Sequence, residues 1–247
     1  MNGQIYQLCM MTTAIKKAIQ SDTTLTYEGQ LFENSTLFFQ RKNSSLEELF
    51  SWYESSKSQG LLEAKIALPI EVTDRSILGF SNATKLSLIV FFPGHKTSFT
   101  PIWNYEPAKN CWNILYQEDT QIAEEILDGF LQNNAIDFLR ILSDISQFAL
   151  EIEMDSFADT FNQAADILMD FSSVSEGMRV SLPQLPPEHL KLFAAASTAD
   201  VFGTMGSWND VPPYLSQQKE LEETYARLSD ELLKQIRLAI LYAINLW

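Results

Sequence analysis

The fold is decided first by residues 85–103, which read KLSLIVFFPGHKTSFTPIW. Two runs rich in β-branched and aromatic residues, 85–92 and 97–103, flank the dipeptide Pro93-Gly94. Such runs are typical of β-strands, and a Pro-Gly dipeptide between them is typical of a tight turn. We therefore predict a pair of antiparallel strands here.

The sequence on either side of this pair predicts an α+β lobe over residues 1–118. Apolar residues at helical spacing predict a helix over residues 5–20, and the capping box Ser44-Ser45-Leu46-Glu47 predicts a second helix that ends near Gly60. Residues 25–27 and 36–40 predict a hairpin, and further strands are predicted at residues 61–68, 76–80 and 111–116. Strands mixed with two helices, without regular alternation, indicate a mostly antiparallel sheet.

The second part of the chain, residues 119–247, predicts an all-helical lobe. Apolar stripes at helical spacing run through residues 122–131, 136–152, 157–169 and 188–202. A stretch rich in Ser and Pro, residues 172–187, resembles a linker, and Ser216 is placed to begin a final helix of about thirty residues. The last ten residues are apolar on nearly every side, which predicts burial within the chain or a homo-oligomer contact through this helix.

Charge divides the chain in the same place. Residues 1–118 carry 10 Lys and Arg against 11 Asp and Glu, whereas residues 119–247 carry 7 against 21, a net of −14. Between residues 119 and 170 there are 12 acids and one base, Arg140. A surface of one negative sign repels nucleic acid and membranes and attracts a basic protein, so a basic protein is the expected partner.

The compartment expected from the sequence is the cytoplasm. The N-terminus lacks the features of a signal peptide, and no apolar run reaches the 18 residues of a membrane span. Two cysteines, Cys9 and Cys111, are too few for a disulfide framework.

No group of residues predicts a catalytic site, a cofactor site or a metal site. The two histidines, His95 and His189, have no nucleophile elbow beside them, and the usual metal-ligand spacings are absent. Two aspartate pairs at i,i+4 spacing, Asp155 with Asp159 and Asp166 with Asp170, place carboxylates on one helix face. A cation site needs further ligands, so these four aspartates are interpreted as a solvated, acidic surface for the partner.

The loop of residues 203–214 is the second candidate for partner binding. It carries Trp208, Asn209, Asp210 and Tyr214, and Trp and Tyr dominate binding hot spots. Two interpretations stay open: these residues contact a partner, or Trp208 fills a gap in the fold while Asn209 or Asp210 caps the turn.

These observations lead to two hypotheses about function. The first is a non-catalytic, intracellular interaction protein of the inhibitor or immunity type, whose acidic helical lobe binds a basic partner. The alternative is a small-molecule-binding protein or hydrolase with a pocket between the lobes, whose polar groups come from residues 104–106 and 207–210.

Overall fold

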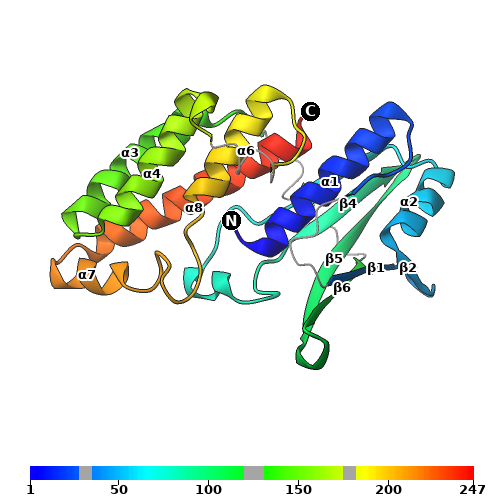
Figure 1. Ribbon diagram of the computed structural model, residues 1–247, viewed down its shortest axis with the longest axis horizontal. Coiled ribbons are helices and arrows are strands. Elements are labelled where there is room, and N and C mark those ends of the chain that lie inside the picture. Colours follow the sequence, from blue (N-terminus) through cyan, green and yellow to red (C-terminus); the bar gives the residue numbers. More distant parts are fainter. Residues whose placement is uncertain (28–34, 120–130, 175–181) are drawn as a thin grey trace. The chain divides into compact units, whose positions relative to one another are not determined.

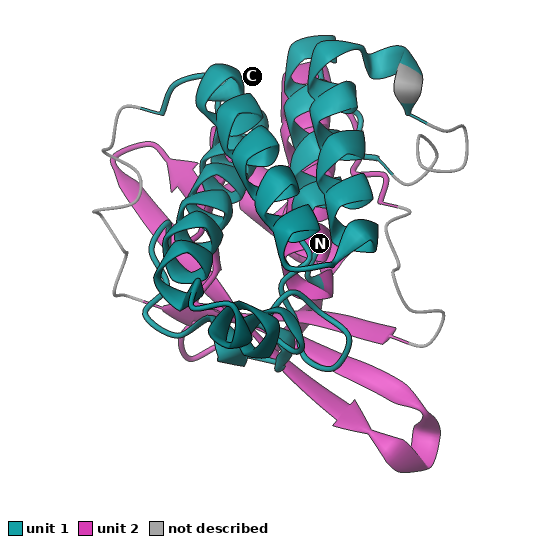
Figure 2. Cartoon of the chain, turned by 90° about the vertical axis from the view of Figure 1, so that its left-hand side faces the viewer, with its two compact units in different colours: residues 1–2, 69–83, 130–247 teal, residues 3–68, 84–129 magenta. Residues whose placement is uncertain are grey.

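The computed structural model describes residues 1–27, 35–119, 131–174 and 182–247 of the chain. It divides into two compact units, and neither is continuous in the sequence. The helical unit holds residues 1–2, 69–83 and 130–247, and the sheet unit holds residues 3–68 and 84–129 (Figure 2). The predicted boundary between residues 118 and 119 lies next to residues 120–130, which are outside the described residues, and it stays a prediction.

The sheet unit is built on a six-stranded mixed sheet with the strand order β2-β1-β6-β5-β4-β3 (Figure 1). Neighbouring strands pair antiparallel except β1 and β6, which run parallel. The strands are β1 (Ser35–Gln40), β2 (Leu46–Glu48), β3 (Glu63–Ala67), β4 (Ser87–Phe92), β5 (His95–Glu106) and β6 (Cys111–Asp119). The pair predicted from residues 85–103 is β4 and β5, and Gly94 between them has a φ of 82°, which glycine adopts without strain.

Helices α1 (Gly3–Ser21) and α2 (Leu49–Ser58) cover one face of this sheet. Phe39 stands opposite Tyr116 in the β1–β6 register, so both side chains point to the same face. The Trp52 ring of α2 stacks on Phe39 at 4.0 Å between centroids, and Gln7 of α1 accepts a hydrogen bond from the Tyr116 hydroxyl. This face therefore holds the core of the sheet unit.

Four antiparallel helices form the core of the helical unit: α3 (Ala135–Glu151), α4 (Asp155–Met169), α6 (Pro187–Ala199) and α8 (Glu222–Asn245). Each packs on the next in a closed ring, because α8 also packs on α3. Hydrogen bonds between helix ends give the directions, since Lys191 near the start of α6 reaches the carbonyl of Met169 at the end of α4. Likewise Lys219, just before α8, donates to the carbonyl of Glu151 at the end of α3.

Smaller elements complete the helical unit. The short helix α7 (Pro212–Gln218) precedes α8. The 3₁₀ helix η1 (Arg75–Gly79) has five residues, and the 3₁₀ helix η4 (Phe171–Ser173) has three. Together, the sheet and the helices confirm the prediction of a mixed α+β fold. In the parts of the chain that the structure describes, no helix combines the length and the apolar character needed to cross a membrane.

Four local predictions were wrong. Residues 76–80 do not form a strand but lie in and just after the 3₁₀ helix η1. The residues of the predicted capping box include strand β2, and no side chain caps helix α2. The final helix is interrupted at residues 219–221, where Glu220 has a φ of 58°. Residues 25–27 are not a strand in the described structure, and β1 pairs with β6 instead.

Candidate functional site

Three of the four aspartates predicted for partner binding lie on helix α4, and Asp170 directly follows its last residue. Asp155, Asp159, Asp166 and Asp170 are all exposed. At about 100° per residue, the three positions within the helix fall within an arc of roughly 40° around the helix axis. The opposite side of α4 is buried through Ala158, Phe161, Ala164, Ile167 and Leu168. The row of aspartates therefore faces solvent along the length of the helix.

The members of this row differ in their local partners. Asp170 follows the helix and accepts hydrogen bonds from the backbone N–H and the hydroxyl of Ser172, which lower the pKa of its carboxyl group. Among the described residues, Asp155, Asp159 and Asp166 form no ion pair with a lysine or arginine. These three carboxylates are therefore available to a cationic partner.

Trp208 does not lie on the surface. Its side chain has no exposed area, and it is surrounded by rings from three helices of the bundle. The ring centroids of Phe157 and Phe161 in α4 lie 5.1 and 5.2 Å from the Trp208 ring, Tyr225 in α8 lies at 5.8 Å and Phe148 in α3 at 6.4 Å. Trp208 therefore fills the end of the helix bundle. Of the two interpretations left open, this agrees with the one in which Trp208 fills a gap in the fold and not with the one in which it contacts a partner.

The polar groups of Trp208 also form hydrogen bonds inside the fold. Its indole N–H donates to the Ser229 hydroxyl at 2.8 Å, and its carbonyl accepts from the Tyr225 hydroxyl at 2.8 Å. Its backbone N–H donates to the carbonyl of Val201 at 3.0 Å. A buried tryptophan with these partners holds its loop in one position.

The other loop candidates have mixed environments. The side-chain amide of Asn209 donates to the carbonyl of Arg75 at 2.7 Å, so it fastens residues 69–83 to the loop. Asp210 accepts from the backbone N–H of Gly206 at 2.7 Å and closes the turn. Tyr214 in α7 is 60% exposed. Of the two aromatic residues predicted here, Tyr214 is the one on the surface.

Tyr214 and the first aspartate of α4 belong to the same end of the bundle. The ammonium group of Lys219, which follows α7, lies 2.7 Å from the Glu153 carboxylate and 2.7 Å from the carbonyl of Glu151. Glu153 lies two residues before Asp155, where α4 begins. An exposed aromatic side chain and the row of aspartates are thus carried by neighbouring elements.

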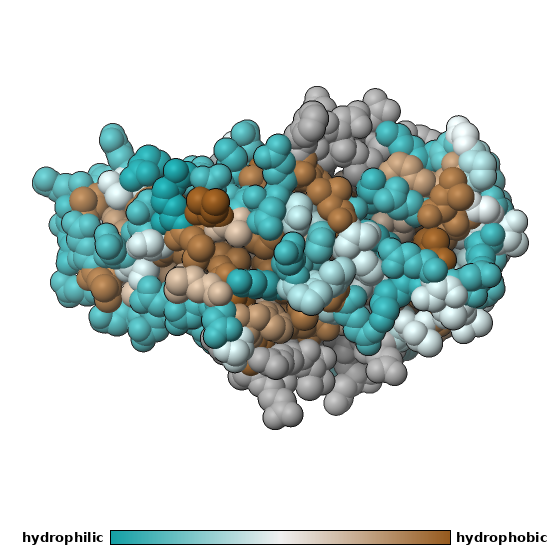
Figure 3. Space-filling view, turned by 90° about the horizontal axis from the view of Figure 1, so that it is seen from above, coloured by the Kyte–Doolittle hydropathy of each residue, from teal (hydrophilic) through white to brown (hydrophobic). Residues whose placement is uncertain are grey.

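Further apolar side chains are exposed on the helical unit. Ile136 and Leu150 of α3, Met169 of α4 and Met205 of the loop are each more than half exposed. Figure 3 shows apolar residues gathered in patches between hydrophilic ones on the face that it presents.

The apolar residues near the end of α8 are not exposed. Ile240 and Ile244 are buried. An oligomer contact through this helix stays a prediction.

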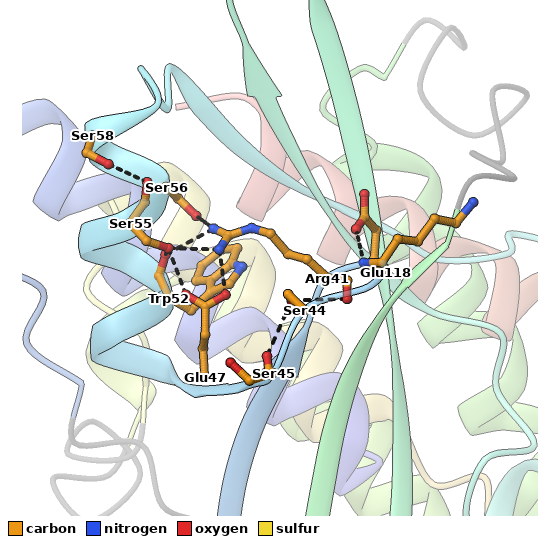
Figure 4. Close-up of polar contacts among 10 residues, drawn as sticks. Arg41, Ser44, Ser45, Glu47, Trp52, Ser55, Ser56, Ser58 and Glu118 are labelled. Atoms are coloured by element: carbon orange, nitrogen blue, oxygen red, sulfur yellow. Dashed lines mark hydrogen bonds and ion pairs between the residues drawn. The ribbon is translucent and has the colours of Figure 1, made fainter.

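In the sheet unit, a polar cluster around Arg41 was not predicted from the sequence (Figure 4). The Arg41 guanidinium group donates to the Glu47 carboxylate at 2.5 Å and to the Ser55 and Ser56 hydroxyls at 2.8 and 2.6 Å. Ser55 in turn donates to Glu47 at 2.8 Å. Both terminal nitrogens of the guanidinium group, the carboxylate and the two hydroxyls are hydrogen-bonded within this cluster, which fastens helix α2 to the strands β1 and β2. The signal in the sequence was the charge pair at residues 41 and 47.

Two small cavities of about 220 Å³ each lie in the sheet unit. One follows the ends of the parallel strands β1 and β6 and is lined by residues 40–43 and 117–118. The other lies beside β1, between residues 35–38 and residues 48–50. Within the described residues, no three His, Cys, Asp or Glu side chains are grouped as metal ligands. The predicted pocket that would join residues 104–106 with residues 207–210 involves both units and stays a prediction.

In comparisons with known proteins, no family model, no curated protein and no solved structure matches the chain.

Proposed function

We propose that this protein is a non-catalytic interaction protein of the inhibitor or immunity type, whose helical unit binds a basic protein partner. The observation that carries the proposal is the exposed row of Asp155, Asp159 and Asp166 on helix α4, with Asp170 at the end of the helix. A row of like charges on one face speeds the encounter with an oppositely charged surface and sets the orientation in which it docks.

The partner expected for this row is a helix or loop that presents several lysine or arginine side chains in line. Arginine is the better match because its guanidinium group binds a carboxylate with two hydrogen bonds. Tyr214, exposed at the same end of the bundle, supplies an aromatic group for contact energy, a role that buried Trp208 does not fill.

The test is a pull-down from an extract of the cells that make the protein, at about 50 mM and about 300 mM salt, because salt screens contacts between exposed charges. The probe variant is the triple substitution Asp155→Asn, Asp159→Asn and Asp166→Asn. It changes the formal net charge from −15 to −12 and keeps the side-chain size. We expect a stoichiometric basic protein that the natural chain retains at low salt and the variant loses.

The matched control removes three charges elsewhere, with Glu54→Gln, Glu71→Gln and Glu222→Gln at exposed positions. Its formal net charge is also −12. If the control loses the partner as fully as the α4 variant does, then total charge and not the row on α4 governs binding. An empty pull-down at both salt concentrations contradicts the proposal.

A further inference from the structure

Two segments of the helical unit that are far apart in the sequence expose apolar side chains next to each other. Ile77 in η1 is 40% exposed, Phe80 directly after η1 is 60% exposed, and Met205 in the loop after α6 is 92% exposed. All three residues belong to the helical unit and to stretches that the structure describes without a gap. We call these three residues the η1–loop patch. A contiguous apolar patch on a protein surface marks a site of interaction.

The two segments are in direct contact, so the three side chains share one area of the surface. A Cβ atom at Gly79 would come within 2.6 Å of the backbone nitrogen of Thr204. Phe80 follows Gly79 and Met205 follows Thr204, so the Cα atoms of Phe80 and Met205 are less than about 13 Å apart. Two turns of a helix cover about 11 Å, which is a similar distance.

Met205 stands at the tip of a turn that hydrogen bonds hold in place. The backbone N–H of Ser207 donates to the carbonyl of Thr204 at 3.0 Å, and Gly206 has a φ of 76°. This is a type II turn, with Met205 as its second residue and the glycine as its third. The Asp210 carboxylate accepts a hydrogen bond from the N–H of Gly206 at 2.7 Å. The exposed methionine is therefore presented on a fixed backbone.

Phe80 is held in a similar way at the end of η1. Its backbone N–H donates to the carbonyl of Ile77 at 2.9 Å, and its carbonyl accepts from the backbone N–H of Ala83 at 3.3 Å. Because Gly79 leaves no room for a side chain against the loop, the segment is closely fitted to it. A surface whose contact residues are already in position loses little conformational entropy when a partner binds.

The charge around the patch is negative. The segments 69–83 and 200–214 carry one basic residue, Arg75, and four acidic residues: Glu71, Asp74, Asp200 and Asp210. The guanidinium group of Arg75 is itself paired with Asp230 of α8. An apolar patch with an acidic border fits a partner that is apolar and basic.

The same charge argues against two other occupants. A second copy of the chain would bring the exposed Asp74 and Asp210 close to carboxylates of the same sign, and an anionic lipid surface would be repelled in the same way. A helix with one apolar face fits better, because its apolar side chains recur within two turns and its basic side chains can lie at the border of that face.

We propose that the η1–loop patch binds an amphipathic helix of a partner protein, whose apolar face covers Ile77, Phe80 and Met205 and whose lysine or arginine side chains lie at the acidic border. It is a second contact surface of the helical unit, and it does not depend on the row of aspartates on α4.

The experiment uses the full chain and a capped, fluorescein-labelled peptide of about 14 residues, or four helical turns, with leucine on one face and lysine at the other positions. Fluorescence anisotropy at about 150 mM salt, where distant charges are screened, measures the affinity. The ¹H–¹⁵N spectra of the protein locate the site. We expect binding, with shifts centred on the amides of residues 77–80 and 204–206.

Two control peptides test the chemistry of the occupant. The first has the same composition but spreads its leucines around the helix, and the second carries glutamate in place of lysine. Each is expected to bind at least about tenfold more weakly, because the first lacks an apolar face and the second has the wrong charge.

Variants of the protein test the patch itself. We expect Met205→Ser and Phe80→Ala each to weaken the leucine–lysine peptide by about fivefold, and the double substitution by at least about tenfold. Met169→Ser, at an exposed methionine on α4, is the matched control and is expected to leave the affinity unchanged. The triple aspartate substitution on α4 is expected to change the affinity by less than about twofold.

Three outcomes would overturn the proposal. The first is no binding of the leucine–lysine peptide at millimolar concentration. The second is binding that the triple substitution on α4 abolishes and that Met205→Ser and Phe80→Ala leave unchanged, which would place the peptide on the row of aspartates and support the proposed function instead. The third is an equal loss for Met169→Ser and Met205→Ser, which would show that the peptide does not select the η1–loop patch.

Discussion

Trp208 in the helical unit and Trp52 in the sheet unit are both fully buried, but the protein uses them differently. The indole N–H of Trp208 donates to the Ser229 hydroxyl, whereas that of Trp52 has no hydrogen-bond partner among the described residues. The hydrogen bonds beside Trp52 come from Arg41, which donates to the Trp52 carbonyl and to the hydroxyls of Ser55 and Ser56. One unit thus fixes its tryptophan through the ring itself, and the other through a charged side chain next to it.

The largest expected effect that follows from this difference is the loss of the Trp208 ring. We expect Trp208→Ala to lower the free energy of unfolding by about 3–5 kcal/mol, because the ring fills the space between three helices. Urea unfolding followed by circular dichroism measures it. Phe80→Ala, at a residue 60% exposed in the same unit, is the control and should change stability by less than about 0.5 kcal/mol. A loss below about 1 kcal/mol for Trp208→Ala would show that the bundle does not need the ring.

Arg41 is expected to matter next. Arg41→Met removes the charged donor for Glu47, Ser55 and Ser56 and is expected to cost about 2 kcal/mol. A double-mutant cycle with Glu47→Gln then measures the coupling between the two side chains. Lys109→Met, which breaks a pair whose lysine side chain is 72% exposed, is expected to cost less than about 1 kcal/mol. Equal losses for the two substitutions would contradict a special role for the Arg41 cluster.

A smaller effect compares the two indole N–H groups directly. Trp208→Phe and Trp52→Phe remove the same atoms, but only the first leaves a buried hydroxyl, that of Ser229, without its donor. We expect Trp208→Phe to destabilise the protein by about 1 kcal/mol more than Trp52→Phe. If the two variants unfold at the same urea concentration, the hydrogen bond to Ser229 contributes nothing to stability.

The smallest expected effect concerns the buried cation of each unit and its dependence on pH. Burial lowers the pKa of Lys16 in the sheet unit to about 8 and that of Arg237 in the helical unit to about 10. Between pH 8 and the ordinary pKa of lysine, the unfolded chain binds more protons than the folded one, so stability rises with pH in that window. We expect Lys16→Met to remove this rise and to stabilise the protein at pH 7, because methionine carries no charge that burial disfavours.

Thermal unfolding at pH 7, 8, 9 and 10 checks this expectation. The natural chain should gain stability over this series relative to Lys16→Met, while Lys17→Met, at the exposed neighbouring position, should follow the natural chain. Parallel curves for Lys16→Met and the natural chain would show that Lys16 is protonated to the same degree in the folded and unfolded states.

Much of the sheet could be predicted from the sequence because its signals are local. The runs at residues 85–92 and 97–103 and the turn at Gly94 need only their neighbours to form a strand pair. The capping-box pattern at residues 44–47 gave a wrong prediction. The Glu47 carboxylate pairs with Arg41 and accepts a hydrogen bond from Ser55, and it does not cap the helix. Its true partners become adjacent only when β1, β2 and α2 are assembled.

Residues 76–80 show a second reason for failure. Their composition suits a strand, but the Asp74 carboxylate accepts hydrogen bonds from the backbone N–H and hydroxyl of Ser76 and begins a 3₁₀ turn. A side chain at Gly79 would come within 2.6 Å of the backbone nitrogen of Thr204, so this position also depends on a loop distant in the sequence. No local pattern contains that contact.

The candidate site was predicted in part for the same reason. The i,i+4 spacing is enough to place the aspartates of α4 on one face, as the helix shows. The sequence left open whether Trp208 contacts a partner or is buried, because its surroundings come from α3, α4 and α8, which are distant from it in the sequence.

The attachment of residues 69–83 to the helical unit has a consequence for how the protein is made. Arg75 pairs with Asp230 and lies over the ring of Tyr225, and 155 positions separate Arg75 from Asp230. At the usual rates of translation, the segment waits roughly 8 to 30 s on the ribosome before its partner helix has been synthesised. During that time Arg75 lacks both Asp230 and the ring of Tyr225, so residues 69–83 can be attached to α8 only after the last helix has been made.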